Sequence, residues 1–387
     1  MKTIQFRDFI ILQRGFDLPK HSRDEGEYPV IAATGIHGSH SEFKVNPPGV
    51  VTGRSGSLGE VVFVERPYWP LNTTLWVKDF KENQPRYVYY FLKTLDLKRF
   101  NSGAGVPTLN RNHLDTLIVK IHDKQSQQKI ATILSTYDDL IENNLRRIKI
   151  LEEMAQTLYR EWFVKFRFPG HQKVKMVDSP LGKIPEGWEA KRLGDIAEDM
   201  RRGVKPSEVP PDTPYIGLEH LPRKSIALSQ WGFAGDVQST KFEFKRGEIL
   251  FGKIRPYFHK VGFAPIDGIC SSDTIVIADK DHKWYPLLLC CVSSEDFVAH
   301  TTQTSKGTKM PRADWEVLTK YPVPVPPPSL LTNFNSFLEN KLGLIENLIF
   351  RNRNLRQTRD LLLPKLISGE LDVSELGIKT TDERLQD

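Results

Sequence analysis

The sequence has little of what membrane-spanning, secreted or disulfide-rich proteins are built from. Its longest nearly uninterrupted apolar stretch, Trp284 to Val292, includes Pro286 and is far shorter than the roughly 20 residues that cross a bilayer. The first residues contain no long apolar core, so we expect no secretory signal and no membrane association. The three cysteines provide neither a disulfide framework nor a Cys-x-x-Cys metal motif, which favours a cytoplasmic location.

Recognisable catalytic motifs are also missing. The ten histidines are scattered without metal-ligand spacing, and no Gly-x-Ser-x-Gly or Walker sequence occurs. Asn46-Pro47-Pro48 resembles the start of the adenine methyltransferase motif, but Gly49 replaces the aromatic residue that stacks on a flipped base. A turn before a strand at Val50 is therefore favoured over a catalytic site. We expect no catalytic residues, no cofactor and no metal.

Length and charge leave room for a multidomain nucleic-acid binder. The chain has 387 residues, which suggests two to three domains. Its 54 lysines and arginines exceed its 48 aspartates and glutamates, which gives a net charge of +6. Such a charge permits binding to nucleic acid but does not establish it.

Two long segments have the apolar spacing of a coiled-coil helix. The first, about residues 124–163, repeats apolar residues at alternating steps of four and three, from Ile130 and Leu134 through Trp162, with one interruption at Asn144. The second, about residues 329–367, repeats most of this stripe 204 positions later. The string LIEN occurs at 140–143 and again at 344–347. Each helix leaves one apolar face in need of a partner, and the other helix is the simplest one.

The segments that precede the two helices also correspond. Gly53-Arg54 follows a β-branched run, as does Gly252-Lys253, and residues 72–79 match residues 272–279. Runs rich in β-branched residues at 49–51, 60–64 and 74–77, and again at 248–251, 260–264 and 274–277, predict strands, while residues 84–100 and 284–302 predict short helices. The fold class is therefore α+β, with two mixed α/β units and two long helices. We expect units at 1–122 and 188–322, a long helix at 123–168, a second long helix with a C-terminal tail at 323–387, and a Pro- and Gly-rich linker at 169–187.

Polar residues within the apolar stripes suggest how the helices pair. In a parallel pair in register, Asn144 and Asn352 would each face an apolar layer, which is costly for a buried amide. An antiparallel pair can place Asn144 opposite Asn352, which then brings Trp162 near Phe334 and Leu134 near Leu362. We therefore predict an antiparallel intramolecular coiled coil with a pseudo-twofold axis near this asparagine pair.

Several strings resemble the specificity (S) subunits of type I restriction–modification systems. They are DSPLGKIPEGWE at 178–189 with LGDI at 193–196, YREWFV at 159–164, and LPKLISGEL at 363–371. The first unit lacks the Pro-x-Gly-Trp string that opens the second. The resemblance covers nearly the whole chain. It implies a non-catalytic subunit whose two target-recognition domains each bind half of a bipartite site on double-stranded DNA. It also implies helices that set the spacing and bind methyltransferase (modification) subunits, and restriction/translocase subunits that join this core.

Basic residues beside glycines are the best candidates for DNA contact. Glycine lets the backbone approach phosphate closely, and arginine or lysine can bind guanine or phosphate. Nine basic residues near glycines, and Asn110 beside Arg111, are the candidates: Arg54, Asn110, Arg111, Arg201, Arg202, Lys205, Lys253, Arg255, Lys306 and Lys309. Ordinary turns with solvated charges remain the alternative for each. For the whole chain, the alternatives are a single-chain DNA methyltransferase or nuclease, or a coiled-coil scaffold without DNA affinity.

Overall fold

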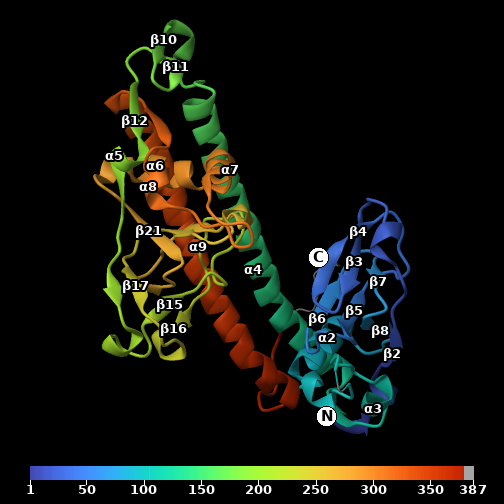
Figure 1. The fold of residues 1–387 in the computed structure, drawn as a ribbon. Helices are drawn as coiled ribbons and strands as arrows, with labels where there is room; N and C mark the ends of the chain where they lie inside the picture. Colours follow the sequence, from blue (N-terminus) through green and yellow to red (C-terminus); the bar gives the residue numbers. More distant parts are fainter. Residues whose placement is uncertain (104, 379–387) are drawn as a thin grey trace. The chain divides into compact units, whose positions relative to one another are not determined.

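The computed structural model describes residues 1–103 and 105–378. They fall into two compact units, one formed by Met1–Ile141 with the segment from Leu355 onward, the other by Glu142–Asn354 (Figure 1). Two long helices, α4 (Lys124–Tyr159) and α9 (Pro328–Ser368), contribute to both units, close to the expected bounds. Neither these nor the shorter helices of the described ranges are long and apolar enough to cross a membrane.

The first unit packs small sheets against helices. A four-stranded sheet has the order β2-β8-β5-β6, a three-stranded sheet has the order β4-β3-β7, and β1 pairs with β9. The predicted strands at 49–51, 60–64 and 74–77 are confirmed as β5, β6 and β8. The elements are β1 Lys2–Gln5, α1 Phe6–Phe9, β2 Ile11–Arg14, β3 Tyr28–Ala32, β4 Gly35–His40, β5 Gly49–Gly53, β6 Val61–Val64, β7 Trp69–Pro70, β8 Thr74–Asp79, α2 Pro85–Thr94, α3 Arg111–Asp115 and β9 Ile118–Ile121.

The second unit repeats this plan. The order β13-β21-β18-β19 corresponds to β2-β8-β5-β6, and β12 pairs with β22 as β1 pairs with β9. A five-stranded sheet, β14-β17-β20-β15-β16, takes the place of the three-stranded one. The elements are β10 Met176–Ser179, β11 Gly182–Pro185, β12 Glu189–Arg192, α5 Leu193–Ile196, β13 Ala197–Asp199, β14 Gly203–Val204, β15 Pro214–Ile216, β16 Gly232–Phe233, β17 Lys241–Phe244, β18 Ile249–Gly252, β19 Val261–Phe263, β20 Gly268–Cys270, β21 Thr274–Asp279, α6 Tyr285–Val292, α7 Glu295–Thr304, α8 Trp315–Leu318 and β22 Pro322–Val325.

Two segments of the second unit differ from the sequence-based expectation. Residues 284–302 form two helices, because the Ser294 hydroxyl accepts a hydrogen bond from the Phe297 amide and so caps the start of α7. Residues 169–187, expected to be a linker, contain the antiparallel hairpin β10–β11. Gly182 has a φ of +86° at its turn, a conformation that favours glycine.

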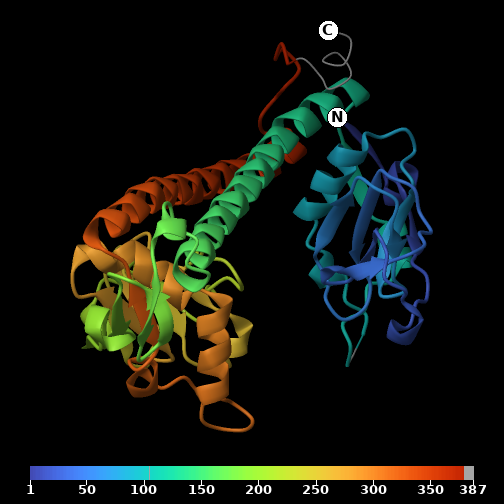
Figure 2. The ribbon, with the colours of Figure 1, turned by 90° about the horizontal axis from the view of Figure 1, so that it is seen from above.

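Within the second unit, α4 and α9 are antiparallel (Figure 2). The Asn144 amide donates a 2.8 Å hydrogen bond to the Asn352 side-chain oxygen, and both residues are buried. In the π-helical turn Arg160–Val164, which follows α4, the Trp162 ring lies 5.8 Å from the Phe334 ring, centroid to centroid. Moving forward along α4 thus moves the partner backward along α9, in the register that the sequence predicts.

Within the first unit, the same two helices are joined by a polar cluster and an apolar one. Asp138 on α4 accepts a 2.6 Å hydrogen bond from the Tyr90 hydroxyl and forms an ion pair with Arg359 on α9. Ile130 and Leu134 share a buried cluster with the α9 residues Leu363, Leu366 and Ile367 and with the core of the unit. The helix pair is therefore part of the hydrophobic core, and α2 is fixed to it by Tyr90.

Candidate nucleic-acid interface

Arg54 leaves the end of β5 in a loop that the backbone holds on both sides. Its amide donates to the carbonyl of Thr73 at 2.8 Å, and its own carbonyl accepts from the amide of Leu109 at 2.8 Å. The Nε atom of Arg54 donates to the carbonyl of Asn72 at 3.0 Å. One edge of the guanidinium is thus fixed to the protein, and its terminal nitrogens can still donate to a ligand.

Arg54 lines a cavity of about 800 Å³, which we name the first basic cavity. Arg14, Asn110 and Arg111 line it too. Asn110 uses its side-chain oxygen to cap α3 at the Asn112 amide, at 3.1 Å, and Arg111 is exposed in the first turn. Burial, and next the positive charge of Arg14, lower the pKa of Arg54, although Asp17 acts in the opposite direction. The local charge is therefore positive and suited to an anionic ligand.

Lys253 occupies the matching place in the second unit. Its amide donates to the carbonyl of Asp273 at 2.8 Å, and its carbonyl accepts from the amide of Ala313 at 3.0 Å. The Nζ atom donates to the carbonyl of Ser272 at 3.0 Å and lies 5.3 Å from the centre of the Phe242 ring. Burial lowers the pKa of Lys253 below its ordinary value. The correspondence with Arg54 thus extends from the backbone to the direction of the side chain.

Lys253 lines a smaller cavity of about 300 Å³, the second basic cavity, together with Arg201, Lys306 and Arg312. Acidic residues partly balance these charges. Arg201 pairs with Asp199 at 2.7 Å, Lys306 with Asp314 at 3.1 Å, and Arg312 with Asp273 at 3.6 Å. Because Lys306 and Arg312 are largely exposed, their pairs are weak and can exchange for contacts with an anion, whereas the Asp199 side chain that holds Arg201 is only 4% exposed.

Four of the predicted residues lie outside the two basic cavities. Arg202 forms an ion pair with Glu248, the residue that precedes strand β18. Lys205 is exposed and pairs with Glu208 at 3.8 Å. Arg255 has a left-handed backbone with a φ of +51°, and its Nε atom is buried without a hydrogen-bond partner. Lys309 is exposed in the loop that follows α7.

Two basic residues that line the cavities, Arg14 and Arg312, were not predicted from the sequence. Arg14 ends β2, the edge strand beside β8, and Arg201 follows β13, the edge strand beside β21, so the two are structurally equivalent. Arg14 precedes Gly15, the same basic–glycine pattern that identified Arg202, so the signal was present. Arg312 had no such signal, because Thr108 stands at its place in the first unit and no glycine adjoins it.

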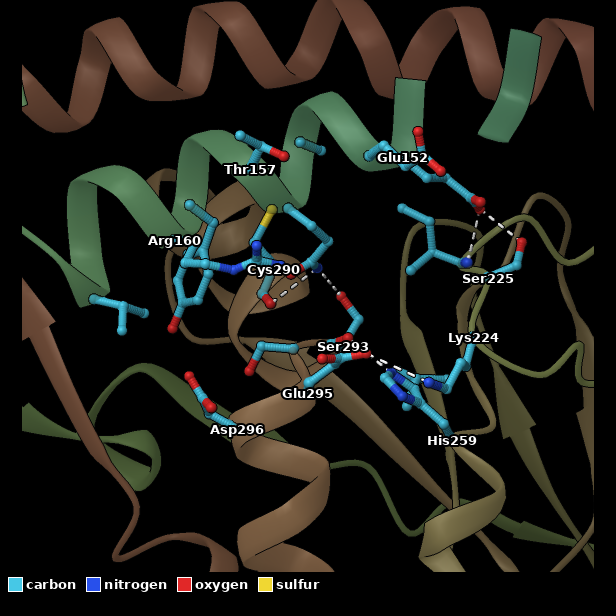
Figure 3. Close-up of a pocket in the computed structure, with 18 of the residues that line it drawn as sticks. Glu152, Thr157, Arg160, Lys224, Ser225, His259, Cys290, Ser293, Glu295 and Asp296 are labelled. Carbon is cyan, nitrogen blue, oxygen red and sulfur yellow. Dashed lines mark hydrogen bonds and ion pairs between the residues drawn. The ribbon is translucent and has the colours of Figure 1, made fainter. Parts of the chain in front are cut away.

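A third cavity, of about 660 Å³, lies in the second unit beside α4 and includes none of the predicted DNA-contact residues (Figure 3). One carboxylate oxygen of Glu152 accepts hydrogen bonds from the Ser225 hydroxyl at 2.7 Å, the Ile226 amide at 2.8 Å and the Ala227 amide at 3.0 Å. Burial raises the pKa of Glu152 despite these donors. Gln156 donates to Ser293 at 2.8 Å. These polar groups serve one another and attach α4 to the rest of the unit.

The described residues, 1–103 and 105–378, contain no group of three or more His, Cys, Asp or Glu side chains placed to hold a metal ion. The segment after Asn46 is a turn that leads into β5, as the sequence analysis favours.

Comparisons with known proteins agree with this architecture. A family model described as the type I restriction modification DNA specificity domain matches residues 1–153 and 185–330. The MjaIX specificity subunit of Methanocaldococcus jannaschii is 28% identical over 315 residues, which cover 75% of this chain and 70% of the relative. The EcoDI specificity subunit of Escherichia coli is 22% identical over 406 residues, covering 96% and 88%.

A solved S subunit from M. genitalium shares the fold, with a TM-score of 0.62, 16% identity, and coverage of 95% of this chain and 96% of that one. The family model alone matches more than half of the chain, in two blocks that contain the two basic cavities. The chain therefore belongs to the family of type I restriction–modification DNA specificity proteins.

Proposed function

We propose that this chain recognises a bipartite sequence in double-stranded DNA, with each unit binding one half. The observation that carries the proposal is the duplicated basic cavity. Arg54 and Lys253 occupy the same place in the two units, are held by matching backbone hydrogen bonds, and donate to matching carbonyls. A folding requirement alone does not call for two such basic side chains. Two anion-binding cavities on one chain suit a ligand with repeated phosphates.

Within each cavity, some residues bind phosphates and others bind base edges. Lysine and arginine at the rims neutralise phosphates, while a partly fixed arginine or an asparagine can bind base edges. Arg54, Asn110, Arg111 and Arg14 serve the first half-site, and Arg201, Lys253, Lys306 and Arg312 serve the second. Arg202, Lys205, Arg255 and Lys309 remain predicted contacts outside the cavities. The two target-recognition domains correspond to residues 1–122 and 188–322.

The chain itself is inferred to be non-catalytic and to deliver partner subunits to DNA. In this proposal α4 and α9, within residues 123–168 and 323–387, bind the methyltransferase subunits, and restriction/translocase subunits join them. Exposed apolar side chains on α4, Ile150 and Met154, support a protein-binding role. Equilibrium dialysis provides a direct test: S-adenosylmethionine should bind the assembled complex and not this chain alone.

The DNA-binding proposal is tested with Arg54→Ala and Lys253→Ala. Each should weaken specific binding by about 1–3 kcal/mol if the side chain contacts a base edge. A phosphate contact would instead weaken all sequences alike and lower the salt slope by about one. The matched controls are Lys81→Ala and Lys280→Ala. These lysines lie just beyond the C-terminal ends of β8 and β21, whereas the cavities lie near the other ends of these strands.

If both cavity variants bind like their controls at every salt concentration, the cavities are ordinary surface features. The target itself should be found by mapping methylated bases in cells that contain the chain and its methyltransferase partner. We expect two short blocks about one helical turn apart, roughly 10 base pairs from centre to centre. One continuous block would contradict the proposal.

A further inference from the structure

Each basic cavity has a loop of the same construction at its rim. The first tip loop (Gly103 and residues 105–107) and the second tip loop (residues 307–311) occupy equivalent positions before α3 and α8. At the base of the first loop, the Ser102 amide donates to the carbonyl of Thr108 at 2.9 Å. At the base of the second, Lys306 and Arg312 exchange backbone hydrogen bonds of 3.2 and 2.9 Å. Ser102 and Thr108 line the first basic cavity, and Lys306 and Arg312 line the second.

A glycine stands at the start of each loop and a proline at its end, and both make close backbone contacts. A Cβ atom on Gly103 would lie 2.0 Å from the carbonyl oxygen of Val106, and one on Gly307 would lie 3.2 Å from that of Met310. Gly307 also has a φ of +102°. The carbonyl of Pro107 accepts a 2.9 Å hydrogen bond from the Gly56 amide, and that of Pro311 accepts one of 2.8 Å from Arg255. Both loops are thus attached to the segment that carries the central basic residue, Arg54 or Lys253.

An apolar side chain projects from the same place in both loops. Val106 is 59% exposed and Met310 is 47% exposed. Neither residue belongs to a hydrophobic cluster of its unit. An exposed apolar residue is unremarkable by itself. Two in matching positions, each held by a tight turn beside a basic cavity, indicate a shared ligand with apolar surface next to negative charge.

We propose that Val106 and Met310 contact base edges in a DNA groove, one in each half of the target. The inference rests on the proposed DNA-binding function. Duplex DNA presents phosphates to the basic rim and, in the major groove, the thymine methyl group to an apolar side chain. Such a contact discriminates between bases without a hydrogen bond. Lys306, Lys309 and Arg312 lie within four residues of Met310 in the sequence, and Val106 lies on the loop whose base residues line the first basic cavity with Arg54 and Arg111.

The test selects preferred targets from randomised DNA with the full chain in complex with its methyltransferase subunits. Val106→Ser should relax preference three- to tenfold at one or two positions of one block, as expected for loss of one or two apolar groups. Met310→Ser should do the same in the other block only. The remaining positions and the salt dependence should stay unchanged. Ile118→Ser and Met176→Ser are matched controls, because their side chains are 59% and 48% exposed outside the tip loops.

Three results would overturn the inference. Variants that select the same target as their controls would show no base contact, and an equal loss on all sequences would show non-specific binding. Intact selection with loss of the methyltransferase subunits on size-exclusion chromatography would assign the tips to a protein partner. A different result would contradict the proposed function itself: the unmodified complex would then select no target at all.

Discussion

Asn144 and Asn352 form a buried polar layer in the interface between α4 and α9, apart from the Asp138–Arg359 ion pair in the first unit. Replacing either one with leucine leaves the other amide buried without this partner, which should lower the free energy of unfolding by about 1–3 kcal/mol. The double variant, Asn144→Leu with Asn352→Leu, should recover most of that loss, because two apolar groups need no hydrogen bond. Urea denaturation of the three variants checks this prediction. Two additive losses in the double variant would contradict it.

Glu152 gives stability a defined pH dependence. Burial raises the pKa of this carboxyl, so the folded protein holds the proton more tightly than the unfolded chain. The stabilisation associated with that proton is present at acid pH and is lost as pH rises through the folded-state pKa. Glu152→Gln keeps an acceptor oxygen and stays neutral. Its unfolding free energy relative to the natural protein should therefore increase between about pH 4 and pH 7.

Urea denaturation at both pH values measures this difference, with Glu153→Gln, the exposed neighbour on α4, as the control. A constant difference across the range would show that Glu152 does not titrate differently in the folded state.

Individual residues also mark the limit of what the sequence predicts. Arg54 and Lys253 were identified because a basic residue follows a glycine in both repeats, and a repeat is visible in sequence. The role of Glu152 could not be foreseen. Two of the three donors to its carboxylate oxygen are the backbone amides of residues 226 and 227, and backbone amides leave no mark in the sequence. Arg312 could not be predicted for a related reason, since only folding brings it into the same cavity as Lys253.

At the scale of elements, the length of the helix pair should set the spacing between the half-sites. Residues 141–147 of α4 and 349–355 of α9 face each other around the asparagine layer. Duplicating both segments adds about 10 Å of helix. The DNA spacer should lengthen by about three base pairs while the two specific blocks stay the same.

Methylation mapping with the lengthened chain measures the spacer. Duplicating only one segment shifts one helix against the other, and this chain should melt at a lower temperature than the doubly lengthened one. An unchanged spacer in the doubly lengthened chain would show that the helices do not determine it.

The helices and strands differ in how clearly the sequence predicts them. The strands β5, β6, β8, β18, β19 and β21 are β-branched runs bounded by glycine or proline, and the heptad stripes of α4 and α9 are long enough to be unambiguous. A serine can cap the start of a new helix or lie within a continuous helix, and composition does not decide between the two. The break between α6 and α7 follows from capping by the Ser294 hydroxyl. The hairpin β10–β11 was hidden because its prolines and glycines suit a linker equally well.

At the scale of the whole molecule, the two basic cavities belong to different compact units and share no residue. Arg54→Ala and Lys253→Ala should therefore lower the binding free energy additively, within about 0.5 kcal/mol. Competition binding with the two single variants and the double variant tests this. A double variant no weaker than the worse single one would mean that both residues act on one contact.

The first unit is assembled from both ends of the chain, and this has a consequence for synthesis. Leu363, Leu366 and Val373 are buried in the core that also contains Phe6 and Phe9, whereas the second unit is one uninterrupted stretch, Glu142–Asn354. A ribosome makes the chain in one direction, and domains generally fold as units during synthesis. The second unit can therefore be complete while the N-terminal part, made earlier, still waits for its last apolar side chains. We therefore expect the first unit to finish folding after the second, with its incomplete core exposed to aggregation until then.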